Sequence, residues 1–346
     1  MIKLTSKLYP DAIESFERAL QYDQKNVYAL AGLGDCYRRQ KDYAKALEYY
    51  NEALEINMDH MPALNQRAVV FSRTHQYTLA ERDWSYLLAL DPDSAPALNG
   101  LGTVCLANGE LDEAFAYFNK ALEANRHFAL ALNNRAVIYV RRNQHDLAFQ
   151  DLDNAISNGR GFALPHFNRA NLYTALGKIE DALHDYELYF KKYVPEDDEE
   201  DDLDERIRRI DNLGLKLSYN GDYKNAIRAF KMVQRAQYDN YSVQYNLAVA
   251  MVRYQPKQSS HTSSIGKARK QLEELLKTST DDSRRATALY GLAGLVALRG
   301  EKTAIEGLKK AVELSSHVIE WARQDAAWHD LRGYPEFESI LNQSWS

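Results

Sequence analysis

The sequence predicts an all-α solenoid of stacked helical hairpins, because small residues recur along it at a nearly fixed interval. One series of alanines comprises Ala12, Ala46, Ala80, Ala114, Ala148, Ala182, Ala226 and Ala268. The first six are spaced by 34 residues, the last two gaps are 44 and 42, and a bulky apolar residue follows each alanine four positions later. Such a period indicates two-helix units that must stack, because a single hairpin cannot bury its own apolar face.

A second series of small residues keeps the same register, twelve positions before each alanine from Ala46 to Ala226. Its members are Gly34, Ala68, Gly102, Ala136, Ala170, Gly214 and Ala248. We expect them to mark the closest crossing of the two helices in each hairpin, with the bulky residue filling the gap beside it. The pattern resembles the tetratricopeptide repeat over nearly the whole chain. This resemblance implies a right-handed superhelical array of about eight to nine repeats and a protein-binding role.

The repeats can be phased along an N-terminal block, residues 1–194. After a half repeat, full repeats are expected at 27–60, 61–94, 95–128, 129–162 and 163–194. Prolines fall where first helices begin, where a missing N–H does no harm, at Pro62, Pro96 and Pro165. Tight turns inside two hairpins are expected at Asn108-Gly109 and Asn220-Gly221.

The repeat register breaks after Val194, where an acidic insertion, residues 195–206, intervenes. It is interpreted as a solvated linker, as a docking strip for a basic partner, or as an internal strip that covers the basic side chains at Arg253, Lys257, Lys267, Arg269 and Lys270. A C-terminal repeat block is expected at 207–315, with a polar loop at 255–264. The aromatic-rich segment 316–346 is expected to form a helical cap.

The first hairpin is incomplete in the sequence. If Ala12 belongs to a second helix, only Met1 to Ser6 remain for the first helix, and the apolar face of Phe16 and Leu20 lacks a cover. Solenoid ends normally need a polar cap. Either the chain is cut from a longer one, or this end docks onto a partner or onto a second copy in a homo-oligomer.

Charge and cysteine content limit the possible partners. The net charge of −6 and the pI near 5.9 argue against nucleic acid, since neutralising phosphates requires a clustered basic surface. Cys36 and Cys105 lie two repeats apart and should not meet, which fits a reducing compartment. The longest apolar run, residues 286–298, is too short to cross a bilayer. We therefore expect a cytoplasmic protein with no membrane partner.

Side-chain amides recur at the sixth position of first helices: Gln66, Asn134, Asn168, Asn212 and Asn246. In the tetratricopeptide family this position faces the concave groove. The run resembles the asparagine ladder in the repeat domain of O-linked GlcNAc transferase, where amides hold the backbone of an extended peptide. An amide has one acceptor and two donors and can mirror a peptide group. The five residues are candidate peptide ligands, with selectivity from Phe167, Asn171, Tyr219 and Tyr245; the alternative is that these amides are merely solvated.

Arginines follow the amides in three repeats, at Arg67, Arg135 and Arg169. Each is matched by an aspartate sixteen residues later, at Asp83, Asp151 and Asp185, whereas the repeats with Leu33 and Leu101 have Tyr49 and Tyr117 there. This correlation favours partly buried ion pairs inside hairpins over anion binding. A carboxylate clamp like that of chaperone-binding co-chaperones is incomplete, because Asp211 would repel a carboxylate.

The sequence indicates no enzyme, cofactor or metal site. The glycine pairs at Gly32 and Gly34 and at Gly100 and Gly102 lie at small-residue positions of helices, and the histidines lack metal-binding spacing. We predict a non-catalytic scaffold that binds an extended or helical segment of a partner protein in its concave groove. The alternatives are a structural subunit that docks by its ends or convex face, a regulatory fragment of a longer enzyme, and a co-chaperone that binds chaperone tails.

Overall fold

The computed structural model describes residues 8–193, 203–236, 241–254 and 260–342, and the part it describes consists of helices and short connections. The contacts divide the chain into two compact units, residues 1–201 and 202–346.

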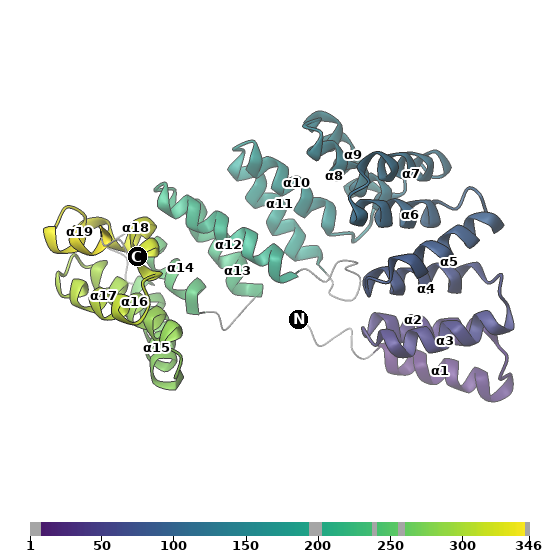
Figure 1. Cartoon of the computed structure of the whole chain (residues 1–346), viewed down its shortest axis with the longest axis horizontal. Coiled ribbons are helices and arrows are strands. Elements are labelled where there is room, and N and C mark those ends of the chain that lie inside the picture. Colours follow the sequence, from purple (N-terminus) through teal and green to yellow (C-terminus); the bar gives the residue numbers. More distant parts are fainter. Residues whose placement is uncertain (1–7, 194–202, 237–240, 255–259, 343–346) are drawn as a thin grey trace. The chain divides into compact units, whose positions relative to one another are not determined.

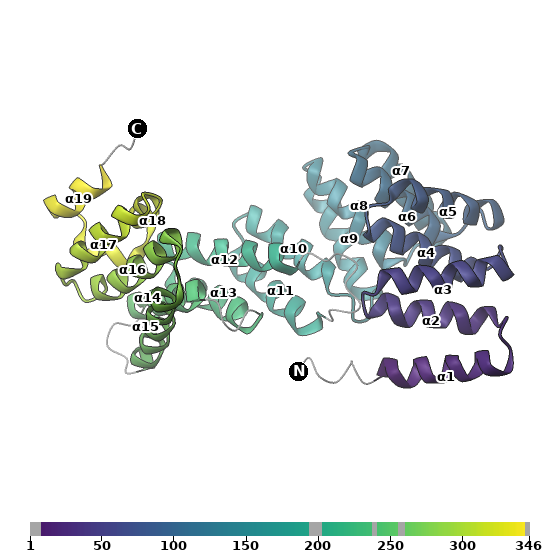
Figure 2. The same cartoon turned by 60° about the horizontal axis from the view of Figure 1, so that its bottom comes forward.

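The N-terminal unit contains a single helix followed by five helical hairpins (Figures 1 and 2). The helices are α1 (Leu8–Tyr22), α2 (Val27–Arg39), α3 (Tyr43–Ile56), α4 (Met61–Arg73), α5 (Tyr77–Leu90), α6 (Ala95–Asn108), α7 (Leu111–Ala124), α8 (Ala129–Arg141), α9 (His145–Asn158), α10 (Leu164–Ala175) and α11 (Ile179–Lys192). In each hairpin the even-numbered helix comes first and packs on the odd-numbered one that follows. The predicted solenoid of stacked hairpins is confirmed.

The C-terminal unit continues the same arrangement and ends in short helices. Its hairpin helices are α12 (Leu203–Tyr219), α13 (Tyr223–Ala236), α14 (Tyr241–Tyr254), α15 (Ser260–Thr278), α16 (Asp282–Ala297) and α17 (Thr303–Leu314). The short helices that follow are α18 (Val318–Gln324), the 3₁₀ helix η2 (Ala326–Leu331) and α19 (Pro335–Leu341). Helix α12 begins within the expected insertion 195–206, and α15 begins within the expected loop 255–264. Residues 195–202 and 255–259 lie outside the described part.

Local signals explain where the helices start and stop. The prolines at 62, 96 and 165 lie in the first turns of α4, α6 and α10. Side chains cap other helices, as when Asn26 accepts a hydrogen bond from the Ala29 amide at 3.0 Å. Gly109 and Gly221 adopt φ values of 84° and 83° in the turns of their hairpins, which glycine reaches without steric cost.

Bulky residues of second helices lie against glycines of first helices. A Cβ atom added to Gly34 would lie 2.5 Å from Tyr50, one at Gly102 would lie 2.5 Å from Phe118, and one at Gly214 would lie 2.6 Å from Phe230. The same happens between hairpins, where Trp84 of α5 lies against Gly100 of α6. The expected small-to-large crossing is therefore present, and it sets both the pairing within a hairpin and the stacking of the next.

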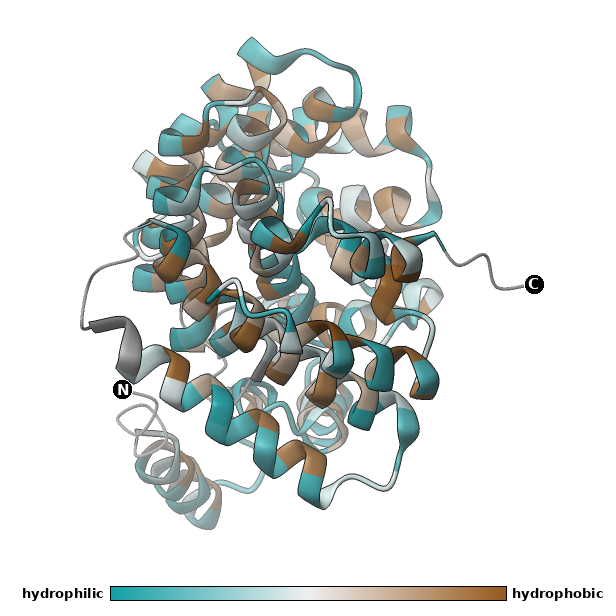
Figure 3. Cartoon of the chain, turned by 90° about the vertical axis from the view of Figure 1, so that its left-hand side faces the viewer, coloured by the Kyte–Doolittle hydropathy of each residue, from teal (hydrophilic) through white to brown (hydrophobic). Residues whose placement is uncertain are grey.

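First helices form the inner layer of each unit. Successive first helices, such as α2 with α4 and α14 with α16, contact one another more extensively than successive second helices do. Helices that approach each other more closely lie on the inside of a curved stack, so first helices line the concave side. The helices in the foreground of Figure 3 carry both polar and apolar residues along their length, as expected for helices that bury one face.

Two remaining features concern the cysteines and the bilayer. Cys36 and Cys105 are both free thiols and both buried, as expected. Across the described ranges, every helix is either too short or too polar to cross a membrane.

The glycine contacts give a first testable prediction. Overpacking of a close contact typically lowers the free energy of unfolding by about 1–3 kcal/mol. The higher helix propensity of alanine compared with glycine raises it by at most about 1 kcal/mol. We expect Gly214→Ala to lower the melting temperature, because its new methyl group would meet the Phe230 ring. Gly266→Ala is the matched control in the same unit, since nothing lies within 4 Å of a Cβ there. Equal melting temperatures for the two variants in thermal circular dichroism would contradict this packing.

Candidate functional site

The amides of the N-terminal unit connect successive first helices. Asn134 on α8 donates from Nδ2 to Oδ1 of Asn99 on α6 at 3.1 Å, and Asn168 on α10 donates to Oδ1 of Asn133 on α8 at 2.8 Å. Both bonds span 35 residues, so each joins the sixth position of one repeat to the fifth position of the repeat before it. These two amides form a ladder, but one donor of each is used inside the protein. Gln66 lies partly buried on α4.

Two residues expected to give selectivity in this unit have internal partners. Phe167 is buried, with its ring centroid 5.5 Å from Tyr186 and 5.2 Å from Tyr189. Asn171 accepts a hydrogen bond from the Tyr186 hydroxyl at 2.8 Å. Phe167 therefore belongs to the core instead of the groove surface, because its position on α10 faces the following helix α11.

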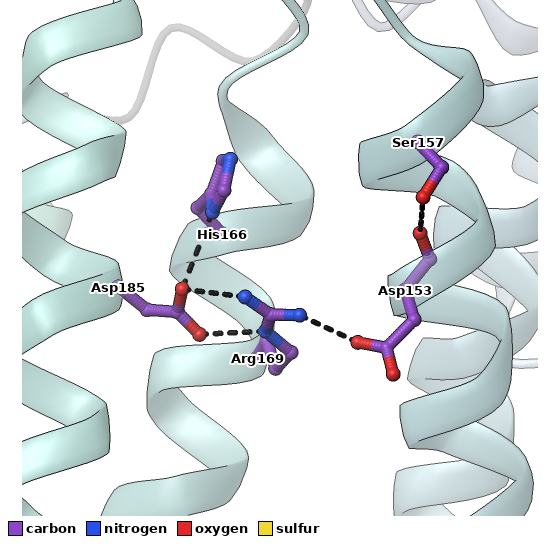
Figure 4. Close-up of polar contacts among 5 residues, drawn as sticks. All are labelled: Asp153, Ser157, His166, Arg169 and Asp185. Carbon is purple, nitrogen blue, oxygen red and sulfur yellow. Dashed lines mark hydrogen bonds and ion pairs between the residues drawn. The ribbon is translucent and has the colours of Figure 1, made fainter.

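The arginines of the N-terminal unit form the expected bidentate pairs within hairpins. Arg67 binds Asp83 at 2.7 and 2.9 Å, and Arg135 binds Asp151 at 2.7 and 2.8 Å. The third pair, Arg169 with Asp185, has the same geometry at 2.7 and 2.8 Å (Figure 4). The structural interpretation of these arginines is thus confirmed.

Each arginine also reaches the preceding hairpin, which the sequence analysis missed. The third guanidinium nitrogen donates to a residue sixteen positions earlier: Arg67 to Asn51, Arg135 to Asn119, and Arg169 to Asp153. One side chain therefore connects both helices of its own hairpin to the second helix of the hairpin before. The signal was available as a repeated polar residue 32 positions before each aspartate.

The third pair includes a buried histidine. His166 Nδ1 lies 3.3 Å from Asp185 Oδ1 (Figure 4), and its Nε2 atom has no hydrogen-bond partner among the described residues. Burial tends to raise the pKa of Asp185, but the hydrogen bonds from Arg169 and His166 outweigh burial and lower that pKa below its ordinary value. The cluster stabilises the ionised carboxylate and has no group placed for chemistry on a substrate.

A cavity of about 570 Å³ opens in the C-terminal unit. Most of its lining comes from the first helices α12, α14 and α16, which places it on the concave side, and Trp321, Gln324, Asp325 and Ala326 also line it. Four of the predicted site residues line it: Asn212, Tyr219, Tyr245 and Asn246. Neither Asn212 nor Asn246 hydrogen-bonds to another residue in the part of the chain described here.

The floor of this cavity is a hydrogen-bonded cluster around Asp325. The hydroxyls of Tyr245 and Tyr290 each donate to Asp325 Oδ2 at 2.7 Å, and the Ala327 amide donates to Oδ1 at 2.8 Å. Trp328 donates from Nε1 to the Tyr290 hydroxyl at 3.2 Å. Tyr245 is thus a buried wall residue whose hydroxyl is already bonded within the protein. Burial raises the pKa of Asp325, and the hydrogen bonds and Arg253 only partly offset this.

The rim of the cavity carries exposed aromatic and polar side chains. Trp321 and Tyr219 are 44% and 55% exposed, and Lys216 is exposed on α12. Arg253, which was expected to belong to a free basic face, donates to the carbonyl oxygens of Ala326 and Ala327 at 3.0 and 3.2 Å. It therefore fixes η2 against α14 and is not available to an acidic strip.

Asp211 interrupts the amide ladder next to the cavity. It lies 35 residues before Asn246, in the position that Asn99 and Asn133 occupy relative to Asn134 and Asn168. No hydrogen bond forms here, and Asp211 Oδ1 is buried without a partner among the described residues. Burial raises the pKa of this carboxyl to about 6.

One group of side chains has metal-ligand spacing, although it fits a metal poorly. The ligand atoms of Cys105, Glu110 and Glu113 lie within 4.8 Å of one another, and both glutamates are exposed. Burial, reinforced by Glu110, raises the pKa of the Cys105 thiol to about 11. A metal would therefore have to displace the thiol proton, because cysteine binds metals as the thiolate.

Known proteins share this architecture. A family model described as tetratricopeptide repeat matches residues 4–60 and 65–127. A tetratricopeptide repeat protein from Parabacteroides merdae is 23% identical with a TM-score of 0.48, covering 72% of this chain and 94% of that one. For pilF of Pseudomonas aeruginosa the identity is 19%, the TM-score 0.47 and the coverage 64% and 96%. A human IFIT1 dimer solved with PPP-AAAA is 16% identical with a TM-score of 0.52, covering 91% and 68%. None of the curated proteins matches the chain.

The stacked hairpins and their small-to-large crossings define a helical-repeat solenoid. Residues 4–60 and 65–127 of this chain are similar to tetratricopeptide repeats. This family supports a role as a protein-interaction scaffold, and its fold is typically a non-catalytic interaction module.

The arginine pairs give a second prediction. In Asp151→Ala, Arg135 keeps a side chain only 21% exposed but loses its carboxylate, and breaking such a pair typically costs about 3–5 kcal/mol. Glu14→Ala is the control, because the Arg18–Glu14 pair is 68% and 61% exposed and such pairs contribute less than about 1 kcal/mol. Urea unfolding followed by circular dichroism measures both. Indistinguishable midpoints would show that the buried pair does not stabilise the unit.

Asp211 gives a third prediction, on pH dependence. Its folded pKa of about 6 exceeds the ordinary value of 3.8, so the folded state favours the protonated form and ionisation destabilises it as the pH rises. Asp211→Asn should raise the melting temperature near pH 8, and the gain should shrink as the pH falls toward about 5. The exposed Glu273→Gln in the same unit serves as control. A gain that does not change with pH would contradict burial as the cause.

Proposed function

We propose that this protein binds an extended or helical segment of a partner protein on its concave side, at the cavity of the C-terminal unit. The observation that carries the proposal is the state of the amides. In the N-terminal unit Asn134 and Asn168 donate to neighbouring repeats, whereas Asn212 and Asn246 line a cavity and are not bonded to other described residues. An amide without a hydrogen bond inside the protein can pair with a peptide group through its acceptor and its donors.

The cavity has further properties of a binding site. It lies among aromatic side chains with a few polar groups, which is the usual composition of a ligand pocket, and its volume lies in the usual range. Tyr219 and Trp321 are exposed at its rim, and tyrosine and tryptophan are among the residue types that most often contribute the binding energy of interfaces once a partner buries them. The family supports a protein as the ligand.

The test is a peptide selection followed by mutation. Peptides selected from a random library against the full chain are labelled, and their affinity is measured by fluorescence anisotropy. We expect Asn212→Ala together with Asn246→Ala to weaken binding by at least about fivefold, because each lost hydrogen bond is worth about 0.5–1.5 kcal/mol.

Gln150→Ala is the matched control for this test, since it also removes an exposed amide, but from a second helix. It should leave the affinity unchanged, and circular dichroism should show full helicity in all variants. Peptides that bind the double variant as tightly as the parent protein would refute binding in the groove. They would favour a subunit that docks through its ends or convex face.

A further inference from the structure

The cavity of the C-terminal unit holds a carboxylate without a cation bound to it. The three hydrogen bonds to the Asp325 carboxylate come from neutral groups, the two tyrosine hydroxyls and a backbone amide. The guanidinium of Arg253 donates instead to two backbone carbonyls and to Asp330 Oδ2 at 2.6 Å. Within the described residues, Asp325 therefore forms no ion pair, although it is partly buried.

Aromatic rings surround this carboxylate. Tyr290 lies with its ring centroid 5.6 Å from Trp321 at an interplanar angle of 69°, and 6.3 Å from Tyr245 at 60°. The three rings thus meet at steep angles instead of stacking, and all three line the cavity. Cations are attracted to aromatic faces, and more strongly where water is excluded. A carboxylate surrounded by aromatic rings is suited to bind an organic cation that is joined to an apolar chain.

The other charged side chains at the cavity indicate whether its occupant is a cation or an anion. Lys216 is the other charged side chain that lines the cavity, but it is exposed on α12, where water and salt screen it. An acidic side chain or a terminal carboxylate of a partner would meet the Asp325 carboxylate, so the less exposed of the two charges favours a positive occupant.

We propose that the cavity binds the basic side chain, arginine or lysine, of the partner segment, with its charged head on Asp325 and its stem between Tyr245, Tyr290 and Trp321. This rests on the proposed function, because the segment's backbone is the part that Asn212 and Asn246 would hold. The neutral donors and the charge of Arg253 only partly offset the cost of burying the Asp325 carboxylate, and a basic side chain bound to it would compensate its charge further. Trp321, exposed at the rim, would cover the stem.

A charge-only change in the peptide tests this proposal. Each basic residue of a selected peptide is replaced in turn, arginine by citrulline or lysine by norleucine. One replacement should weaken binding to the parent protein by about tenfold, the effect expected for a lost ionic and cation–π contact. The same replacement in the peptide should have little further effect on its affinity for the Asp325→Asn variant. Selected peptides without basic residues, or peptides that tolerate every replacement, would overturn the proposal.

A second measurement does not depend on selecting a peptide. N-acetyl-arginine amide and its citrulline counterpart are titrated into ¹⁵N-labelled full chain, and the indole N–H signals are followed by NMR. Arginine amide should shift the signals of Trp321 and Trp328 saturably, and citrulline amide should not. Trp84 is the internal control, since its indole donates to Asn65 in the N-terminal unit. Equal shifts with both amides, or none, would overturn the proposal.

Variants separate the possible failures. Should Asp325→Asn lose helicity, Trp321→Ala replaces it, since this exposed side chain can be removed without opening the core. A peptide that requires Asn212 and Asn246 but no basic residue would leave the proposed function intact and refute this inference. A library that yields no groove-dependent peptide would refute the proposed function, and the amide titration would still decide whether the cavity binds a cation.

Discussion

The contact between a bulky ring and a glycine is the constraint on which the rest of the structure depends. Tyr50, Phe118 and Phe230 each occupy space that a single methyl group on the facing glycine would fill. Close-packed cores tolerate such a change poorly, because side chains cannot shift without losing their own contacts. The rings therefore fix the distance and angle at which helices cross. That geometry places first helices on the inside of the curve, where the amides and the cavity are found.

Polar side chains then set the register that apolar packing alone would leave loose. Arg67, Arg135 and Arg169 join three helices each, and the bonds of Asn134 and Asn168 join successive first helices. Directional bonds of this kind specify one arrangement, because a slipped repeat would leave buried groups without partners. The consequence is a division of roles: the N-terminal unit uses its amides for its own architecture, and the C-terminal unit leaves two exposed to the cavity.

The repeat spacing predicted the hairpins, the small-to-large crossings and the arginine–aspartate pairs, because each is a local event repeated at a constant interval. It could not predict the burial of Phe167, because the rings that cover it, Tyr186 and Tyr189, belong to the next helix and the repeat spacing does not show that they contact it. The floor of the cavity was also missed. Asp325 and Tyr245 are 80 residues apart, outside the period, and nothing in the spacing connects them. Asn212 and Asn246 were selected from sequence, but the wall that encloses them was not.

The bond between Tyr245 and Asp325 also affects how the C-terminal unit can come apart. Solenoids usually fray from an end, one repeat after another, since each repeat contacts only its neighbours. Here the tail returns past α15, α16 and α17 to bind α14, so the last two hairpins cannot open singly while that bond holds.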